Sequence, residues 1–195
     1  MPRRELEFEP GSYYHVFNRG VNKERIFFEQ ENYNFFLRRM REILVYQEIE
    51  VITYCLMPNH FHMIVCPMKE NFSTQMGLLG MSYAKAINSR YKRAGPLFQS
   101  RFQAKWVGKN EYLLHLSRYI HINPVLGKLV GKAENWEFSS FRDYLGLQKE
   151  DFLKPGIVLE QFSMSMGDIV NQQKAYREFV EGFLGDDIQQ IQHLL

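Results

Sequence analysis

Residues 57–65 of the chain read MPNHFHMIV, a stretch in which two histidines flank one bulky apolar residue. The stretch is typical of a β-strand, where alternate side chains project from opposite faces. His60 and His62 are therefore expected on one face of a sheet, with Phe61 turned into a core on the other. Two imidazoles held side by side indicate a metal site. The alternative for this pattern taken alone is a pair of surface or hydrogen-bonded histidines.

The segments on either side of this pattern predict an antiparallel hairpin. Apolar runs over 49–57 and 60–67 are separated by Pro58-Asn59, a dipeptide typical of turns. A strand and a helix precede the hairpin, and a helix and a strand follow it. This order predicts an α+β protein with a ferredoxin-like antiparallel sheet and helices packed on one face. The further elements are expected at 13–18, 30–46, 73–91 and 103–107.

A third long helix is expected over residues 111–122. Leu113, Leu116 and Ile120 form an apolar stripe that can dock on the sheet. Because Pro124 disfavours helical geometry at the residue before it, Asn123 is expected at a frayed helix end. Polar residues three or four positions apart form another line along this helix. They are Tyr112, His115, Tyr119 and Asn123.

The composition is that of one compact domain with an appendage. The chain has 195 residues, of which 45% are hydrophobic and 24% charged, so it is long enough to bury a sizeable core. No apolar run approaches the roughly 20 residues that cross a bilayer, and the N-terminus does not resemble a signal peptide. A cytoplasmic protein is therefore expected. Cys55 and Cys66 lack metal-ligand spacing and are predicted to be reduced core residues.

The charged residues are distributed unevenly along the chain. Residues 71–110 contain seven Lys or Arg and no Asp or Glu, whereas from Glu134 onward there are eleven acids and five bases. Aromatic residues, among them Phe98 and Trp106, are interleaved with the bases of the first segment. This pattern favours a nucleic-acid partner, because rings stack on unpaired bases while cations follow phosphates. The alternative is a solvated basic helix.

These motifs together resemble the single-tyrosine HUH transposases, and most closely the branch of REP-associated tyrosine transposases. The resemblance rests on His60-Phe61-His62 and on a downstream helix with the sequence YIHINPV over 119–125. It covers roughly residues 13–146, about two thirds of the chain. Three further blocks resemble the family: YHVFNRG at 14–20, LFQSRF at 97–102 and WEFSSF at 136–141.

The resemblance implies an enzyme that cleaves and rejoins single-stranded DNA. Tyr119 would be the nucleophile that displaces the 3′ hydroxyl and keeps the 5′ phosphate as a covalent link. His60 and His62 would be metal ligands, with Asn123 as the third ligand. A phenol with a pKa near 10 is a weak nucleophile at neutral pH, so the metal is expected to stabilise the developing charge. The covalent link conserves phosphodiester energy, so rejoining needs no ATP.

The family implies Mg²⁺ or Mn²⁺ as the divalent metal. Imidazole ligands suit Mn²⁺ or Zn²⁺ better than Mg²⁺, and Zn²⁺ is expected to bind without supporting turnover. His115 and His121 are interpreted as local hydrogen-bonding or DNA-contacting residues. Tyr112 is a weaker candidate nucleophile than Tyr119. The alternative role for Tyr119 is packing at the surface of an amphipathic helix. Asn123 also has a simpler alternative role, as a cap of the helix end.

The substrate implied by the family is a DNA hairpin with a short flanking guide sequence. Arg19 lies in a glycine-ended turn, which the resemblance places near the DNA. Basic side chains follow phosphates, and one aromatic ring is a candidate stacking platform. For Arg93 the alternative is a solvated charge at a helix end. The predicted DNA-binding residues are Arg19, Arg90, Arg93, Phe98, Arg101 and Lys105.

Residues 1–150 are interpreted as the catalytic domain and residues 151–195 as a helical C-terminal extension. Apolar residues recur at helical spacing after Ile169. One hypothesis is that acids such as Asp186 and Asp187 fold over the basic face as a gate. The alternative is a helix that covers the core or a dimer surface. The family implies a monomer or a homodimer.

Two other classes of function remain open at this point. In the first, the chain is a ferredoxin-like nucleic-acid-binding module that forms no covalent adduct. In the second, a hydrolytic metal-dependent nuclease uses water in place of Tyr119. The substitution Tyr119→Phe separates these functions, because only a tyrosine nucleophile requires the phenol oxygen.

Overall fold

The helices and strands of the computed structural model follow the predicted order. The structure describes residues 7–108, 110–162, 168–183, 189 and 192–195. Within these ranges the strands are β1 Tyr14–Arg19, β2 Ile49–Met57, β3 His60–Pro67 and β4 Gln103–Trp106. The helices are α1 Gln30–Ile43, α2 Phe72–Arg90, α3 Asn110–Leu126, α4 Phe141–Tyr144, α5 Gly156–Leu159 and α6 Ile169–Glu181.

The strands form an antiparallel sheet in the order β2-β3-β1-β4. The hairpin partners β2 and β3 are neighbours, and β1 lies between β3 and β4. With α1 and α2 as the two crossovers, this topology confirms the predicted ferredoxin-like fold. The register between β1 and β3 places Arg19 opposite His60 and Phe17 opposite His62.

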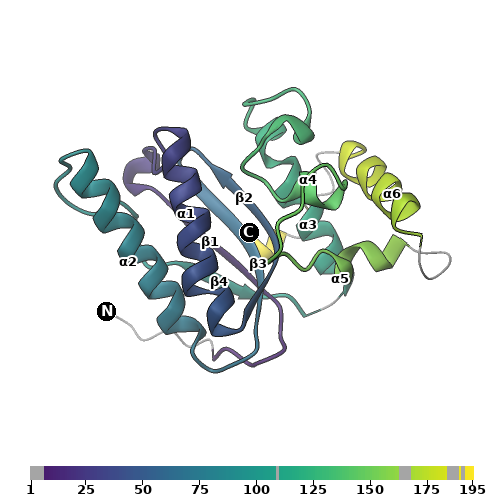
Figure 1. Cartoon of the computed structure of the whole chain (residues 1–195), viewed down its shortest axis with the longest axis horizontal. Coiled ribbons are helices and arrows are strands. Elements are labelled where there is room, and N and C mark those ends of the chain that lie inside the picture. The colour runs from purple at the N-terminus through teal and green to yellow at the C-terminus, as the bar shows by residue number, and fades with distance from the viewer. Residues whose placement is uncertain (1–6, 109, 163–167, 184–188, 190–191) are drawn as a thin grey trace.

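Helices cover both faces of this sheet (Figure 1). On one face, Phe36 of α1 and Tyr83 of α2 join Phe61 in a first core. On the other face, α3 and α6 bury a second core that includes Ile52 and Ile64 of the sheet. The predicted one-sided packing holds for α1 and α2. The later helices add a layer because β2 and β3 present apolar residues to both faces.

The segment before α4 covers the outer edge of β2. The backbone N–H of Leu56 donates to the carbonyl of Phe138 at 2.9 Å, and that of Ser140 donates to the carbonyl of Tyr54 at 3.0 Å. The indole Nε1 of Trp136 also donates to the carbonyl of Leu56. These contacts satisfy backbone groups that an uncovered edge strand would leave for pairing with another chain.

Helix α1 is shorter than the predicted span of 30–46. It begins after Glu29, which forms a capping box with Asn32, and it ends at Ile43. Residues 45–47 form a 3-10 turn, and Glu48 then adopts a left-handed φ of 60°. A left-handed residue cannot continue the helix, so the chain turns at once into β2.

Helix α3 is longer than predicted, and the expectation of a frayed end at Asn123 is wrong. The helix continues through Pro124 to Leu126, so Asn123 lies inside it and is only 7% exposed. Asn123 is therefore no cap at the helix end. Pro124 and the residues just before it are buried, so tertiary packing holds a turn that the local preference disfavours. The helix ends at Leu126 and a turn follows, in which Lys128 has a φ of 56°.

His121 connects α3 to α6 within the second core. Its ring is fully buried, with Nδ1 2.7 Å from the Tyr176 hydroxyl and Nε2 2.8 Å from the Ser140 hydroxyl. Burial lowers the pKa of His121 to about 3, so the ring is neutral at pH 7. The interpretation of His121 as a local hydrogen-bonding residue is confirmed, and its burial leaves no surface for DNA.

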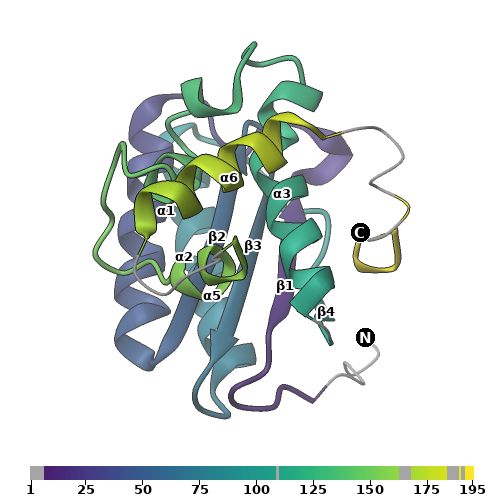
Figure 2. The same cartoon turned by 90° about the vertical axis from the view of Figure 1, so that its right-hand side faces the viewer.

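Helix α6 lies over the second core beside α3 (Figure 2). Tyr176 and Val180 of α6 are fully buried there, in the cluster that contains Ile64 of β3. The extension therefore covers core, which is the alternative to the gate hypothesis. Asp186 and Asp187 lie outside the described residues. The gate and the domain division at residue 150 stay predictions.

The cysteines and the helix lengths also bear on the sequence predictions. Cys55 and Cys66 are both buried free thiols, which confirms their interpretation as reduced core residues. None of the described helices is both long enough and apolar enough to cross a membrane.

Tyr176 provides a test of the packing of α6. We expect Tyr176→Ala to lower the free energy of unfolding by about 3–5 kcal/mol, because it removes a buried ring. Tyr176→Phe should cost about 1–2 kcal/mol, because it removes only the hydroxyl that contacts His121 and Ser117. Urea unfolding measures both. Val170→Ala, at a position 70% exposed on the same helix, is the control and should change stability by less than about 0.5 kcal/mol.

Candidate active site

Strand β3 presents His60 and His62 on the face of the sheet that α3 covers. Their ring centroids are 5.0 Å apart, with an interplanar angle of 83°. Phe61 points to the opposite face, where its ring centroid lies 5.2 Å from that of Phe36. The strand alternation predicted from the sequence thus brings the two imidazoles together and keeps the phenyl ring in the first core.

Each of the two imidazoles has one nitrogen occupied by a neighbouring side chain. Nδ1 of His62 lies 2.9 Å from Nε2 of His15, a fully buried residue on β1. Nδ1 of His60 lies 2.6 Å from Oδ1 of Asn59 in the hairpin turn. A ring with Nδ1 occupied can bind a metal only through Nε2. Nε2 is therefore the candidate ligand atom of both histidines.

Helix α3 places Tyr119 and Asn123, one helical turn apart, beside these histidines. The Tyr119 ring is half-buried, and its centroid lies 5.8 Å from that of His62, edge to face. Nδ2 of Asn123 donates to the carbonyl of Tyr119 at 3.2 Å. The Asn123 side chain also lies near enough to His60 to raise the pKa of its imidazole. Since Nδ2 is directed to the helix backbone, Oδ1 is the amide atom that remains for a contact on the side of the imidazoles.

The surroundings of the histidine pair favour neutral imidazole. Burial lowers the pKa of His62 well below its usual value, and the neighbouring His15 and His60 lower it further. Burial also lowers the pKa of His60. The neighbouring Asn123 raises this pKa and the charge of Arg19 lowers it, and the net shift is downward. Both rings are therefore neutral at pH 7 and retain a lone pair for a ligand.

The remaining donor atoms suit a divalent metal. Two imidazole nitrogens and one amide oxygen form a set that Mn²⁺ and Zn²⁺ accept, and that Mg²⁺ accepts when water or phosphate oxygens complete its shell. In the described part of the chain, no three His, Cys, Asp or Glu side chains form a group that could hold a metal. A metal at this place would therefore require a ligand of another type, and Asn123 is positioned to supply it.

The other polar residues of the α3 line make different contacts. The Tyr112 ring lies 4.7 Å from that of His193, near the end of the chain. The His115 ring lies 5.5 Å from that of Phe179 on α6. Tyr119 contacts a strand histidine, which favours it over Tyr112 as the candidate nucleophile.

Two of the predicted DNA-binding residues lie on the histidine face of the sheet. Arg19 is directly opposite His60 in the β1–β3 register, and its Nε donates to Oε1 of Gln99 at 3.4 Å. Lys105 is opposite His15 in the β1–β4 register, so it projects to the same face. Its Nζ donates to the carbonyl of Leu195 at 2.5 Å. Both cations are thus placed where a phosphate bound at the histidines would be attracted.

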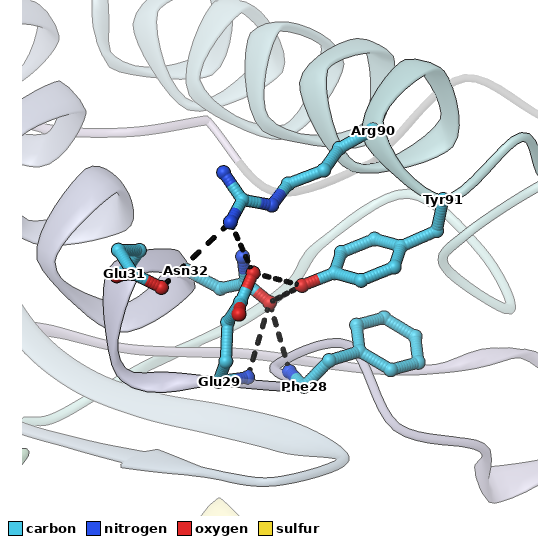
Figure 3. Close-up of polar contacts among 6 residues, drawn as sticks. All are labelled: Phe28, Glu29, Glu31, Asn32, Arg90 and Tyr91. Atoms are coloured by element: carbon cyan, nitrogen blue, oxygen red, sulfur yellow. Dashed lines mark hydrogen bonds and ion pairs between the residues drawn. The ribbon is translucent and has the colours of Figure 1, made fainter.

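Arg90 and Arg93 instead form ion pairs on the α1 and α2 side of the sheet. Figure 3 shows the Arg90 guanidinium, which lies 2.6 Å from a Glu29 carboxylate oxygen and 3.7 Å from one of Glu31. Arg93 lies 3.3 Å from a carboxylate oxygen of Glu24. The structure therefore does not bring this pair of arginines to the histidine face, and neighbouring acids partly compensate their charge.

Phe98 and Arg101 also lie away from the histidines. The Phe98 ring packs near Phe61 and Tyr83 of the first core, with centroids 6.3 Å from each. Phe98 and Arg101 line a cavity of about 920 Å³ between α2 and residues 96–103. The predicted DNA-binding set is thus divided between the two faces of the sheet.

His15 and Asn59 are site residues that the sequence analysis did not single out. His15 lies two and four positions before Phe17 and Arg19, so strand alternation places all three on one face. That signal was available in the block 14–20. What the sequence could not show is the register of β1 against β3, which places His15 within reach of His62.

Residues 10–123 match the protein family described as "Transposase IS200 like". The matched span includes His60, His62 and Tyr119 and ends at Asn123. Fold, site and this match place the chain among the transposases. More particularly, the chain belongs to the IS200-like transposase family, since the match covers more than half of its 195 residues. The resemblance found in the sequence is confirmed.

One solved structure of a transposase shares this fold, and a second is less similar. A REP-associated tyrosine transposase bound to a REP hairpin is similar with a TM-score of 0.64 and 16% sequence identity, over 78% of this chain and 96% of that one. A candidate transposase from Deinococcus radiodurans has a TM-score of 0.43 and 14% identity, over 61% of this chain and 95% of that one. No curated protein matches the chain in sequence. The first similarity confirms the fold class.

Gly20, which follows Arg19 at the end of β1, is predicted to tolerate no side chain. A Cβ atom there would lie 2.1 Å from the carbonyl oxygen of Glu24. We expect Gly20→Ala to lower the free energy of unfolding by about 1–3 kcal/mol, because the turn beside Arg19 must shift. Gly77→Ala is the matched control, since a Cβ on this α2 glycine meets nothing within 4 Å. It should stabilise the protein by up to about 1 kcal/mol. Equal effects in urea unfolding would contradict the prediction.

Proposed function

We propose that the chain is a metal-dependent endonuclease and strand transferase for single-stranded DNA, with Tyr119 as its nucleophile. The observation that carries the proposal is the position of Tyr119 on α3, with its ring 5.8 Å from that of His62. A phenol from a helix and two imidazoles from a strand thus meet in one site. Membership of the IS200-like transposase family supports DNA transposition as the biological setting.

The proposed reaction begins with attack by Tyr119 on the phosphorus of a phosphodiester. The hydroxyl of Tyr119 loses its proton and its oxygen bonds to phosphorus, while the bond from phosphorus to the 3′ oxygen breaks. That oxygen takes up a proton, which leaves a free 3′ hydroxyl and a 5′-phosphotyrosine. Attack by another 3′ hydroxyl reverses these changes and releases Tyr119. No ATP is consumed, because one phosphoester bond replaces another.

The residues of the chain prepare the site for this attack. Leu116 and Ile120, on either side of Tyr119 along α3, are fully buried, so the helix that carries the phenol is fixed on the second core. His60 and His62 are neutral and keep a lone pair, and Asn123 is held by its bond to the helix backbone. These three residues would hold Mg²⁺ or Mn²⁺, which supplies charge stabilisation at the scissile phosphate. Zn²⁺ is expected to bind without turnover.

A DNA hairpin with an adjoining single strand is the proposed substrate. The REP-associated transposase of similar fold is bound to a REP hairpin, which supports this class of partner. In the present chain, Arg19 and Lys105 lie on the histidine face and are the stronger candidates for phosphate contacts. Arg90 and Arg93 are weaker candidates because they are already paired with acids. The proposal is compatible with either a monomer or a homodimer.

A covalent protein–DNA adduct is the decisive prediction. Labelled single-stranded hairpins from the flanks of the gene, incubated with Mn²⁺ or Mg²⁺, should give an adduct on a denaturing gel. Tyr119→Phe should abolish this adduct while leaving DNA affinity unchanged, because it removes only the phenol oxygen. Tyr112→Phe, on the same helix, is the matched control and should still form the adduct. Chelation of the metal by EDTA should prevent its formation.

Other outcomes of this experiment would identify the alternatives. Cleavage that persists in Tyr119→Phe without an adduct would identify a hydrolytic nuclease. Tight binding without cleavage or adduct, in any of the metals, would identify a non-catalytic binding module.

The placement of the arginines predicts unequal effects on DNA affinity. We expect Arg19→Ala to weaken hairpin binding roughly tenfold, because it removes a cation that lies beside the histidine site. Arg90→Ala should change affinity by less than about twofold, because Glu29 and Glu31 already compensate part of this charge and Arg90 lies away from the histidine face. Fluorescence anisotropy at fixed salt compares the two variants. A larger loss for Arg90→Ala would show that the DNA follows the α2 side of the sheet.

A further inference from the structure

Behind the candidate metal ligand His62 lies His15, a buried histidine that is not itself a candidate ligand. His15 of β1 is fully buried, and its Nε2 lies 2.9 Å from Nδ1 of His62. The two rings are stacked, with centroids 5.1 Å apart and planes inclined by 17°. The Phe17 ring lies on the same stack, 4.8 Å from that of His15. The contact is thus a hydrogen bond between two nearly parallel rings, whose strands are paired in the sheet.

A hydrogen bond between two imidazoles can run in either direction, and the direction decides whether His62 can bind a metal. If Nδ1 of His62 carries the hydrogen and donates, its Nε2 has a free lone pair. If Nε2 of His15 donates instead, Nδ1 of His62 accepts and its Nε2 carries the hydrogen. A nitrogen that carries a hydrogen has no lone pair for a metal. Only the first arrangement is compatible with His62 as a ligand.

We propose that His15 is a positioning residue that accepts a hydrogen bond from Nδ1 of His62 and so keeps Nε2 of His62 free for the metal. The inference rests on the proposed function, because it assigns a role toward the metal site. His15 itself touches neither the metal nor DNA in this role. Its effect is to select one tautomer and one ring orientation of His62, as acceptors behind metal-binding histidines do.

The choice of an imidazole as the acceptor fits the chemistry of the site. Carboxylates often serve this purpose behind metal-binding histidines. A carboxylate at His15 would add a negative charge beside a site proposed to bind a DNA phosphate. A neutral imidazole accepts the same hydrogen bond without that charge. Its full burial also excludes water, which would compete for Nδ1 of His62.

The first test uses the metal-free wild-type protein and measures tautomers directly. Long-range ¹H–¹⁵N NMR at pH 7, with the His62 signals assigned from a His62→Ala variant, distinguishes a protonated Nδ1 from a protonated Nε2. We expect His62 to carry its hydrogen on Nδ1 and Nε2 of His15 to be unprotonated. A hydrogen on Nε2 of His62 would overturn the inference. This measurement needs no His15 variant, so it decides the matter even where such a variant does not fold.

The second test measures Mn²⁺ affinity by the loss of the free Mn²⁺ signal in electron paramagnetic resonance. His15→Phe keeps a ring but removes the acceptor, and it should weaken Mn²⁺ binding by about 10- to 100-fold. His15→Gln can place an amide oxygen near the position of Nε2, and it should retain affinity within roughly threefold of wild type. His115→Phe, a histidine change outside the site, is the control and should leave affinity unchanged. Thermal unfolding confirms that each variant is folded.

The variants also separate failure of this inference from failure of the proposed function. If His62→Ala loses Mn²⁺ binding while His15→Phe binds as tightly as wild type, the role of His15 is wrong and the metal site stands. If wild type and His62→Ala bind Mn²⁺ equally, the metal site itself is wrong, and the role of His15 fails with it. Equal losses in His15→Phe and His15→Gln would assign His15 to packing alone.

Discussion

The structure depends on the burial of β3 on both of its faces. This strand lies between β2 and β1, and its alternate residues enter different cores, with Phe61 in the first and Ile64 in the second. A shift of one residue in register would exchange the faces and send His60 and His62 into the aromatic core. Hydrophobic burial therefore fixes where the imidazoles lie. Polar neighbours then decide how each ring is oriented.

Helix α3 joins the C-terminal extension to the site. It carries Tyr119 and Asn123 beside the strand histidines, while His121, between them in sequence, bonds to Tyr176 of α6. The extension thus holds the helix that presents the candidate nucleophile. Two buried histidines have different partners in this arrangement, since His121 bonds to the Tyr176 hydroxyl whereas His15 bonds to His62, a candidate metal ligand. Tyr176 lies beyond the matched span of 10–123, so a residue outside that span contacts the helix of the site.

Predictions that rest on local pattern agree with the structure more closely than those that rest on distant neighbours. The bounds of β2 and β3 are as predicted, because the Pro58-Asn59 turn and the apolar alternation are local signals. The predicted end of α3 is wrong, because burial of the turn around Pro124 overrides the local preference of the residue before proline. The charge of Arg90 likewise looked available for DNA, and only the fold brings Glu29 of the α1 cap beside it.

The sequence by itself determined the order of the strands and helices, the shared face of His60 and His62, and the spacing of Tyr119 and Asn123 on one helix. Each of these follows from the period of a strand or a helix, which acts over a few residues. Only the tertiary structure decided that α3 lies against β3 and that His15 reaches His62. The reason is that β1 and β3 are far apart in sequence, and burial of two cores, rather than any local pattern, selects their register.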